Sequence, residues 1–156
     1  MTGMAIATQE AVFRKLDASL VLDNFLARHE NFDRAGIYDF VPSSAQSGNN
    51  HLFPMVTIGE DQPAELDTDD SVGGDIVVSI HIWSRSPSWF ECKRIADAVR
   101  DVLQRQTLDV PDHHFIGMDW TDDDYIRDPD GITLQVISRY RLQIERIGLP
   151  GPGMLL

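Results

Sequence analysis

The sequence predicts an α+β fold in which two helices pack on one face of a mainly antiparallel sheet of four to five strands. Three patterns predict this fold. Apolar residues alternate along residues 75–86, recur at helical spacing along 90–106, and alternate again along 132–147. A strand with one apolar face, followed by a helix with one apolar stripe, is most simply a sheet packed under a helix. With the remaining elements, the expected order is α-β-β-β-α-β-β.

The N-terminal part of the chain predicts a helix and a short strand. Apolar residues at helical spacing indicate one helix over about 8–28, and Gly36 then breaks the pattern. Residues 37–41 are mostly apolar and aromatic, and they predict a short strand that Pro42 ends.

Two polar segments flank the second predicted strand. Residues 43–51 are small and polar and predict an exposed loop, whereas 53–58 predict a strand with Pro54 near its start. Residues 59–74 contain turn formers and almost no apolar side chains, which predicts a long surface loop. Seven carboxylates and no basic residue lie between positions 59 and 75.

The central strand and the helix after it carry the clearest signals. Ser88 is expected to cap the N-terminus of the helix, and Glu91, three residues later, to complete a capping box. The apolar face of the strand consists of Ile76, Val78, Ile80 and Ile82. The apolar stripe of the helix consists of Cys92, Ile95, Ala96, Val99, Val102 and Leu103.

The C-terminal third predicts a hairpin. Residues 115–120 predict a fourth strand, which 125–127 extend after an interruption by the sequence TDDD. The sequence DPDG at 128–131 predicts a type I turn with Gly131 at a positive φ. Residues 132–147 then form the longest strand, with one face on the core and the other turned outward.

Length and composition predict one domain over residues 1–147, followed by a Gly/Pro-rich tail at 148–156. The 25 acidic and 13 basic side chains give a net charge of −12. This charge excludes tight binding to the outside of DNA or to an anionic membrane, since both need clustered Lys and Arg. The single cysteine, Cys92, permits no internal disulfide and is expected as a buried core thiol.

Few residues point to catalysis. His113 and His114, with Asp119 nearby, are a possible metal site, but adjacent residues of a strand face opposite ways. The sequence contains no HExxH, GxSxG or phosphate-binding glycine motif. We therefore expect no catalytic residue, no metal and no cofactor.

Other residues are better candidates for contacts between proteins. The first group comes from the acidic segment and consists of Glu65, Asp67, Asp69 and Asp70. The second is Arg139 and Arg141, on the outward face of the last strand, where they can pair with a neighbour's carboxylates or stay ordinary surface arginines. The third is the apolar end of the tail, Met154, Leu155 and Leu156, which is expected to dock on a neighbouring subunit.

Six stretches taken together resemble a known family. They are IYDFVP (37–42), FPMVTIGED (53–61), LDTDD (66–70), DIVVSIHIWSRS (75–86), KRIADAVRDVL (93–103) and YIRDPDGITLQVISRYRL (125–142). The chain, over about residues 8–146, resembles the small tail-completion or tail-terminator proteins of long-tailed phages, also found in prophages and gene transfer agents. The segment 43–52 is longer than is usual for this family.

The resemblance implies a structural virion protein and not an enzyme. Such proteins form a ring, usually of six copies, at the head-proximal end of the tail tube, and they are assembled in the host cytoplasm. The implied partners are further copies of the chain, the tail tube protein and the head connector or neck protein, while DNA passes through without specific binding. The alternatives are a head-completion adaptor, a tube subunit or, less favoured, a metal-dependent enzyme.

Overall fold

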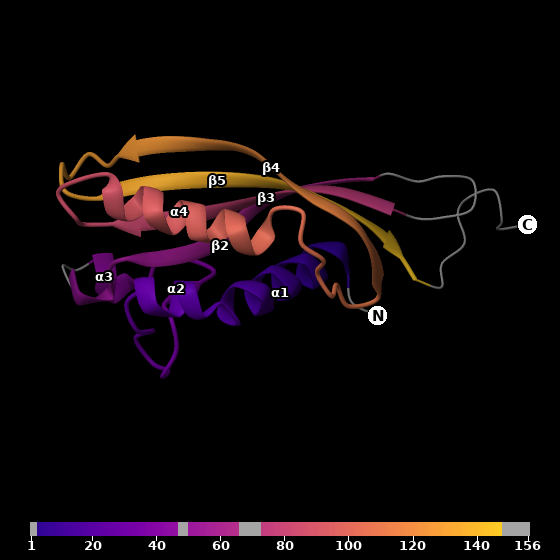
Figure 1. The fold of residues 1–156 in the computed structure, drawn as a ribbon, viewed down its shortest axis with the longest axis horizontal. Coiled ribbons are helices and arrows are strands. Elements are labelled where there is room, and N and C mark those ends of the chain that lie inside the picture. Colours follow the sequence, from indigo (N-terminus) through magenta and orange to yellow (C-terminus); the bar gives the residue numbers. More distant parts are fainter. Residues whose placement is uncertain (1–2, 47–49, 66–72, 148–156) are drawn as a thin grey trace, which may run out of the picture.

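A computed structural model describes residues 3–46, 50–65 and 73–147. It shows a five-stranded sheet in the order β1-β2-β3-β5-β4, with one face covered by helices (Figure 1). The helices are α1 (Met4–Asp17), α2 (Leu20–Phe25), α3 (Ser43–Gln46), the 3₁₀ turn η1 (Asn50–Leu52) and α4 (Phe90–Leu103). The strands are β1 (Ile37–Tyr38), β2 (Met55–Glu65), β3 (Gly73–Ser84), β4 (His113–Arg127) and β5 (Leu134–Arg146). The predicted α+β class is confirmed.

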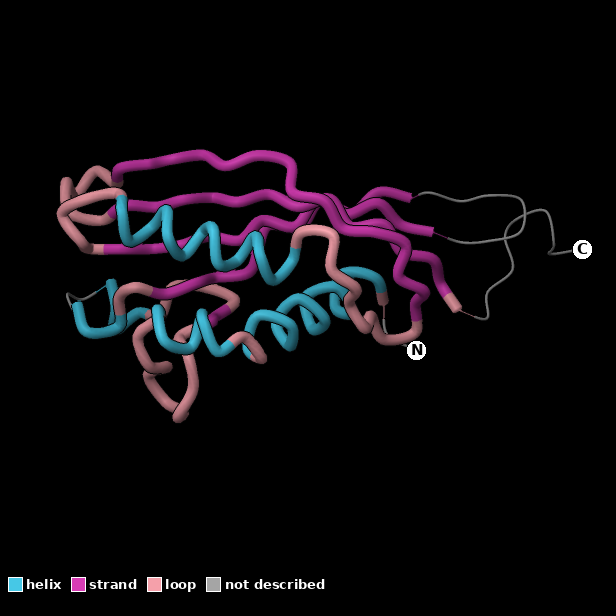
Figure 2. Tube along the Cα trace, viewed as in Figure 1, coloured by secondary structure: helices cyan, strands magenta, loops and turns pink. Residues whose placement is uncertain are grey.

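The main core lies between the sheet and helices α1, α2 and α4 (Figure 2). The four isoleucine and valine residues predicted for the inner face of β3 are fully buried. They meet the stripe of α4, of which Cys92, Ile95, Ala96, Val99 and Leu103 are buried and Val102 is half-buried. A smaller cluster, Ala45, Leu52 and Met55 with Trp83, packs near α3. Since Met55 and Trp83 alternate with the inward Val56 and Ile82, this cluster covers one end of the opposite face.

The single N-terminal helix predicted over 8–28 is wrong, because the structure has two helices there. Helix α1 ends at Asp17, and Ser19 starts α2 with its Oγ accepting from the backbone N–H of Leu22 at 3.2 Å. An extended residue that caps the next helix cannot also continue the previous one. The break lets Leu16 and Leu22 both reach the core, where both are fully buried.

The long loop predicted at 59–74 is also wrong over most of its described part. Strand β2 continues to Glu65, which pairs with Gly74 at the start of β3, so the two strands form a long hairpin. A register shift between Gly59 and Gln62 accommodates the irregular sequence. Pro63 is tolerated because β1 pairs with β2 only at Val56 and Thr57, which leaves the outer edge of β2 free further along.

Four other boundaries differ from the predictions. The predicted loop at 43–51 contains α3 and the start of η1, and β1 is limited to two residues. The sequence TDDD does not interrupt β4, which runs for 15 residues, because a register shift between Trp120 and Asp122 absorbs the extra residue. Strand β5 begins at Leu134, two residues later than predicted.

The start of α4 does not use the predicted capping box. Ser88 lies outside the helix, and its Oγ is 3.4 Å from the backbone N of Phe90. Glu91 instead accepts a hydrogen bond of 2.6 Å from the hydroxyl of Ser84, the last residue of β3. The Ser84 Oγ also accepts from the backbone N–H of Ser86 at 3.0 Å. A buried serine of the central strand therefore fixes the chain as it turns into α4.

Replacing Ser84 should consequently matter more than replacing Ser88. We expect Ser84→Ala to lower the free energy of unfolding by about 1–2 kcal/mol, because the half-buried Glu91 carboxylate loses its donor. Ser88→Ala should change it by less than about 0.5 kcal/mol, as for other exposed positions. Urea unfolding of both variants measures this, and a larger loss for Ser88→Ala would restore the capping box.

The turn between β4 and β5 is built around Asp130. Its carboxylate accepts from the hydroxyl of Thr133 at 2.6 Å and from the backbone N–H groups of Ile132 and Thr133 at 2.8 Å each. These bonds, led by the Thr133 hydroxyl, lower the pKa of Asp130 to about 2. Gly131 has a φ of 73°, as the sequence predicts for this turn.

The Asp130 carboxylate should make stability fall at low pH. Its folded pKa lies below the ordinary value of about 4, so its contribution is complete above pH ~4 and is lost as the pH falls through about 2. Thr133→Val removes the leading donor and should raise the pKa of Asp130 towards the ordinary value. Thr133→Ser keeps the hydroxyl and should leave it low. A carboxyl-carbon NMR titration measures each pKa, and an unchanged value in Thr133→Val would contradict this account.

Candidate functional site

The described candidate side chains, Arg139 and Arg141, lie on the outer face of the sheet. They project from β5 on the side away from α4, as the alternation predicts. The backbone of Glu65 lies at the far end of β2, opposite Gly74. The remaining candidates are outside the described residues, namely Asp67, Asp69, Asp70, Met154, Leu155 and Leu156.

Arg141 pairs with a carboxylate of the neighbouring strand β3. Its Nε lies 2.8 and 2.9 Å from the two carboxylate oxygens of Asp75. Its terminal nitrogen Nη2 lies 2.5 Å from Asp75 Oδ2. This fork matches the two oxygens of a carboxylate, so the pair is geometrically specific. The hydrogen bonds from Arg141 lower the pKa of Asp75.

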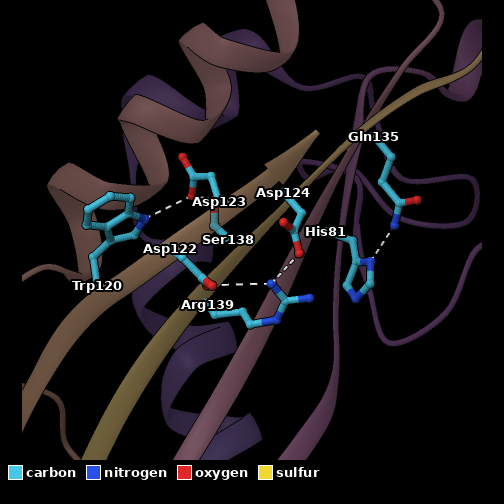
Figure 3. A network of polar contacts seen from close by, with 8 residues as sticks. All are labelled: His81, Trp120, Asp122, Asp123, Asp124, Gln135, Ser138 and Arg139. Carbon is cyan, nitrogen blue, oxygen red and sulfur yellow. Dashed lines mark hydrogen bonds and ion pairs between the residues drawn. The ribbon is translucent and has the colours of Figure 1, made fainter. Parts of the chain in front are cut away.

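Arg139 pairs with two carboxylates of β4. One guanidinium nitrogen lies 2.6 Å from Asp124 Oδ2 and 3.5 Å from Asp122 Oδ1. Figure 3 shows Asp122 and Asp124 meeting this arginine on one side of the strand. The hydrogen bond to Asp124 is the main cause that raises the pKa of Arg139. Both candidate arginines are thus paired within their own chain, which makes this part of the outer face polar and locally neutralised.

Asp123, between the two outward aspartates, points to the opposite side of the sheet. Its Oδ1 accepts from the indole N–H of Trp120 at 2.9 Å and from the hydroxyl of Ser138 at 2.7 Å. Its Oδ2 lies 3.2 Å from a guanidinium nitrogen of Arg100 on α4. The Arg100 guanidinium in turn stacks at 3.9 Å from the centre of the Trp120 ring. Figure 3 shows Asp123 bonded to Trp120, and through Arg100 the same carboxylate joins the edge strand β4 to α4.

This network was not predicted, because the sequence TDDD is typical of an interruption between strands. The parity of a continuous strand was the available signal, since it places residue 123 on the face opposite to 122 and 124. The Asp123 side chain is only 8% exposed, against 54% and 56% for its two neighbours. A carboxylate at that depth needs hydrogen-bond donors for its oxygens, and this one has three.

The described residues hold no arrangement that indicates catalysis. His113 is nearly buried with its Nδ1 2.7 Å from the carbonyl oxygen of Pro111, while His114 is exposed. Within the described ranges, no three His, Cys, Asp or Glu side chains are placed to hold a metal ion. Burial raises the pKa of the Cys92 thiol to about 11, which disfavours the reactive thiolate. No helix among the described residues is long and apolar enough to cross a membrane.

A hollow of about 510 Å³ lies beside α1 and β1. Its lining includes Glu10, His29, Arg34 and Tyr38. Glu10 is held by Arg14 at 2.7 Å, and the His29 ring stacks on Tyr38 with centroids 4.4 Å apart. Burial lowers the pKa of His29, so this ring is mainly neutral near pH 7. These groups do not converge as a nucleophile and a base.

The Asp123 network generates a stability prediction. Asp123→Ala should lower the free energy of unfolding by about 2–3 kcal/mol, because Arg100, Trp120 and Ser138 lose a shared acceptor in a water-poor site. Asp124→Ala is the matched control, and its exposed pair with Arg139 should be worth less than about 1 kcal/mol. Urea unfolding midpoints measure both, and equal losses would show that the parity of residue 123 has no energetic consequence.

Comparison with known proteins gives a family and a fold. Residues 10–145 match the family described as Tail completion protein gp17. A chain of the solved structure described as "Virion of native gene transfer agent (GTA) particle" is 20% identical, with a TM-score of 0.77. The likeness covers 93% of this chain and 99% of that chain. At this identity it shows the fold alone.

No curated protein matches the sequence. The family match, however, spans most of the chain and includes α4, strands β1 to β4 and all but the last residue of β5. It confirms the resemblance carried by the six sequence stretches. The chain therefore belongs to the tail completion protein family and is a structural protein of the phage-type virion tail.

Proposed function

We propose that this protein caps the head-proximal end of a phage-type tail tube as a ring, of six copies, and helps to join the tail to the head. The observation that carries the proposal is the family match over residues 10–145. The partners are other copies of the chain, the tail tube protein and a head connector or neck protein. DNA passes through the ring without specific binding.

The open edge of the sheet supports a role in assembly. Strand β4 is the outermost strand, is 15 residues long and has one edge with no partner strand among the described residues. Unpaired backbone groups on such an edge can bond to a neighbouring subunit. Its outward carboxylates discourage indiscriminate pairing, because an edge rich in charge joins only to a partner that compensates it.

The charge of the chain suits a passage for DNA. A net charge of −12 repels phosphate, so DNA can slide past such a surface without adhering to it. In this proposal Glu65, Asp67, Asp69 and Asp70 line the channel or contact a ring partner. Arg139 and Arg141 contribute to the ring surface through their paired, polar face. The Met154, Leu155 and Leu156 end docks on a neighbouring subunit.

Particles assembled without the protein test this function. We expect mature heads beside unjoined tails of abnormal length, since nothing stops growth of the tube at its upper end. The purified wild-type protein should form rings with six-fold symmetry and a central hole. Negative-stain microscopy measures both, and restoring the wild-type protein should restore joined particles.

The same images separate the alternatives. Unjoined tails of normal length would contradict the capping role and favour a head-completion adaptor. A complete lack of tails would favour a tube subunit. Joined, infectious particles of normal tail length would overturn the proposal.

A further inference from the structure

A small surface at one end of the molecule combines exposed aromatic rings with positive charge. It consists of Phe25 at the end of α2, Trp89, Phe90, Lys93 and Arg94 around the start of α4, and Tyr125 near the end of β4. We call it the cationic–aromatic patch. Phe90 is 70% exposed and Tyr125 is 51% exposed, although both side chains are large aromatic rings. Such a cluster is typical of the centre of a protein interface.

The two cations link the rings into one surface. The Arg94 guanidinium lies 4.5 Å from the centre of the Phe25 ring and 5.7 Å from that of Phe90. The Lys93 ammonium lies 5.3 Å from the centre of the Tyr125 ring. Tyr125 meets Trp89 edge to face, with centroids 5.7 Å apart. These contacts orient both cations over aromatic faces and leave their outer sides to solvent.

Lys93 and Arg94 have no carboxylate partner in the part of the chain that the structure describes. Six other cations do have one, namely Arg14, Arg28, Arg100, Arg105, Arg139 and Arg141. Both residues also lie in or next to the first turn of α4, where the helix dipole disfavours positive charge. The two cations therefore contact aromatic rings of their own chain, while no described carboxylate of that chain neutralises them.

Nucleic acid is a poor candidate for the missing partner. Two cations on a chain with a net charge of −12 cannot provide the counterion release on which phosphate binding depends. An acidic protein segment fits better, because aromatic and aliphatic contacts can supplement a few ion pairs. The chain itself contains such a segment, with seven carboxylates and no basic residue between positions 59 and 75.

The segment cannot reach the patch of its own copy. Glu65 of β2 pairs with Gly74 of β3, so the described residues that flank the central part of the segment lie at the start of β3, whereas the patch follows the other end of β3 (Figure 1). Strand β3 has 12 residues, so it separates the two by about 35 Å. A contact between them therefore joins two copies. It is heterologous, with different surfaces on the two sides, which is the type that closes into a ring.

We propose that the cationic–aromatic patch of one copy receives the acidic segment at 59–75 of a neighbouring copy. The proposal rests on the self-association proposed above and names its contact. Lys93 and Arg94 pair with carboxylates of the neighbour, and the rings of Phe90 and Tyr125 shield these pairs from water. Screening by salt should weaken the contact.

Charge reversal in the full chain tests the contact. We expect Lys93→Glu with Arg94→Glu to raise the dissociation constant of self-association at least about tenfold, and Asp69→Lys with Asp70→Lys to do the same. The variant with all four changes, or an equimolar mixture of the two double variants, should return to within about threefold of wild type. Sedimentation velocity at about 50 and 500 mM salt measures each constant.

A matched control changes the charge equally elsewhere. Lys15→Glu with Arg105→Glu should leave self-association unchanged, and Phe90→Ala should weaken it at both salt concentrations. Self-association of the patch variant equal to that of wild type would overturn the contact and leave the ring intact. If the wild-type chain is monomeric and binds only tail tubes, the cationic–aromatic patch does not bind a second copy of the chain, and the proposed contact is wrong. The tail-capping role would then still be decided by the particle images.

Discussion

The register of β3 is the constraint on which the rest of the structure depends. This strand is the middle one of the five, and its neighbours β2 and β5 pair with it along nearly its whole length. Its inner residues, from Ile76 to Ile82, are fully buried under α4. A slip of one residue would move all of them to the outer face and expose the polar set to the core. Since each fully buried isoleucine is worth about 1.5–3 kcal/mol, the sheet has one stable register.

That register also decides where the charges of the other strands go. Strand β5 copies the alternation of β3, so Arg139 and Arg141 face outward, and β4 copies that of β5. The three consecutive aspartates of β4 are thereby divided, with Asp123 bonded to the helix layer and its neighbours bonded to Arg139. The aspartates therefore have two roles, because successive residues of a strand face opposite sides of the sheet. The buried member holds the edge strand to α4, and the exposed members lie on the outer face of the sheet.

The sequence predicted the features that depend on repeated patterns. It did not predict features that depend on a single tertiary contact. Alternation identified both faces of β3, and helical spacing identified the stripe of α4, because each rests on several residues that agree. The start of α4 could not be predicted, since Ser84 and Ser88 both precede Glu91 and only the packed strand brings Ser84 to its carboxylate. The hairpin at 59–74 was missed for a different reason. An edge strand gains its backbone bonds from β3 and needs few apolar side chains, so its composition looks like that of a loop.

The surfaces near the two ends of β3 differ in their side chains. Six arginines contact a carboxylate of their own chain, whereas Lys93 and Arg94 contact aromatic rings, and the pair of Glu65 and Gly74 that flanks the acidic segment lies at the other end of β3. In the contact proposed above, the patch of one copy meets the acidic segment of the next, so the contacts are head-to-tail and not two-fold. Head-to-tail contacts repeat with the same rotation at every step, so the angle between the two ends sets how many copies close a ring. In the proposed ring, β3 connects the two contact surfaces, because the patch follows one of its ends and the acidic segment adjoins the other.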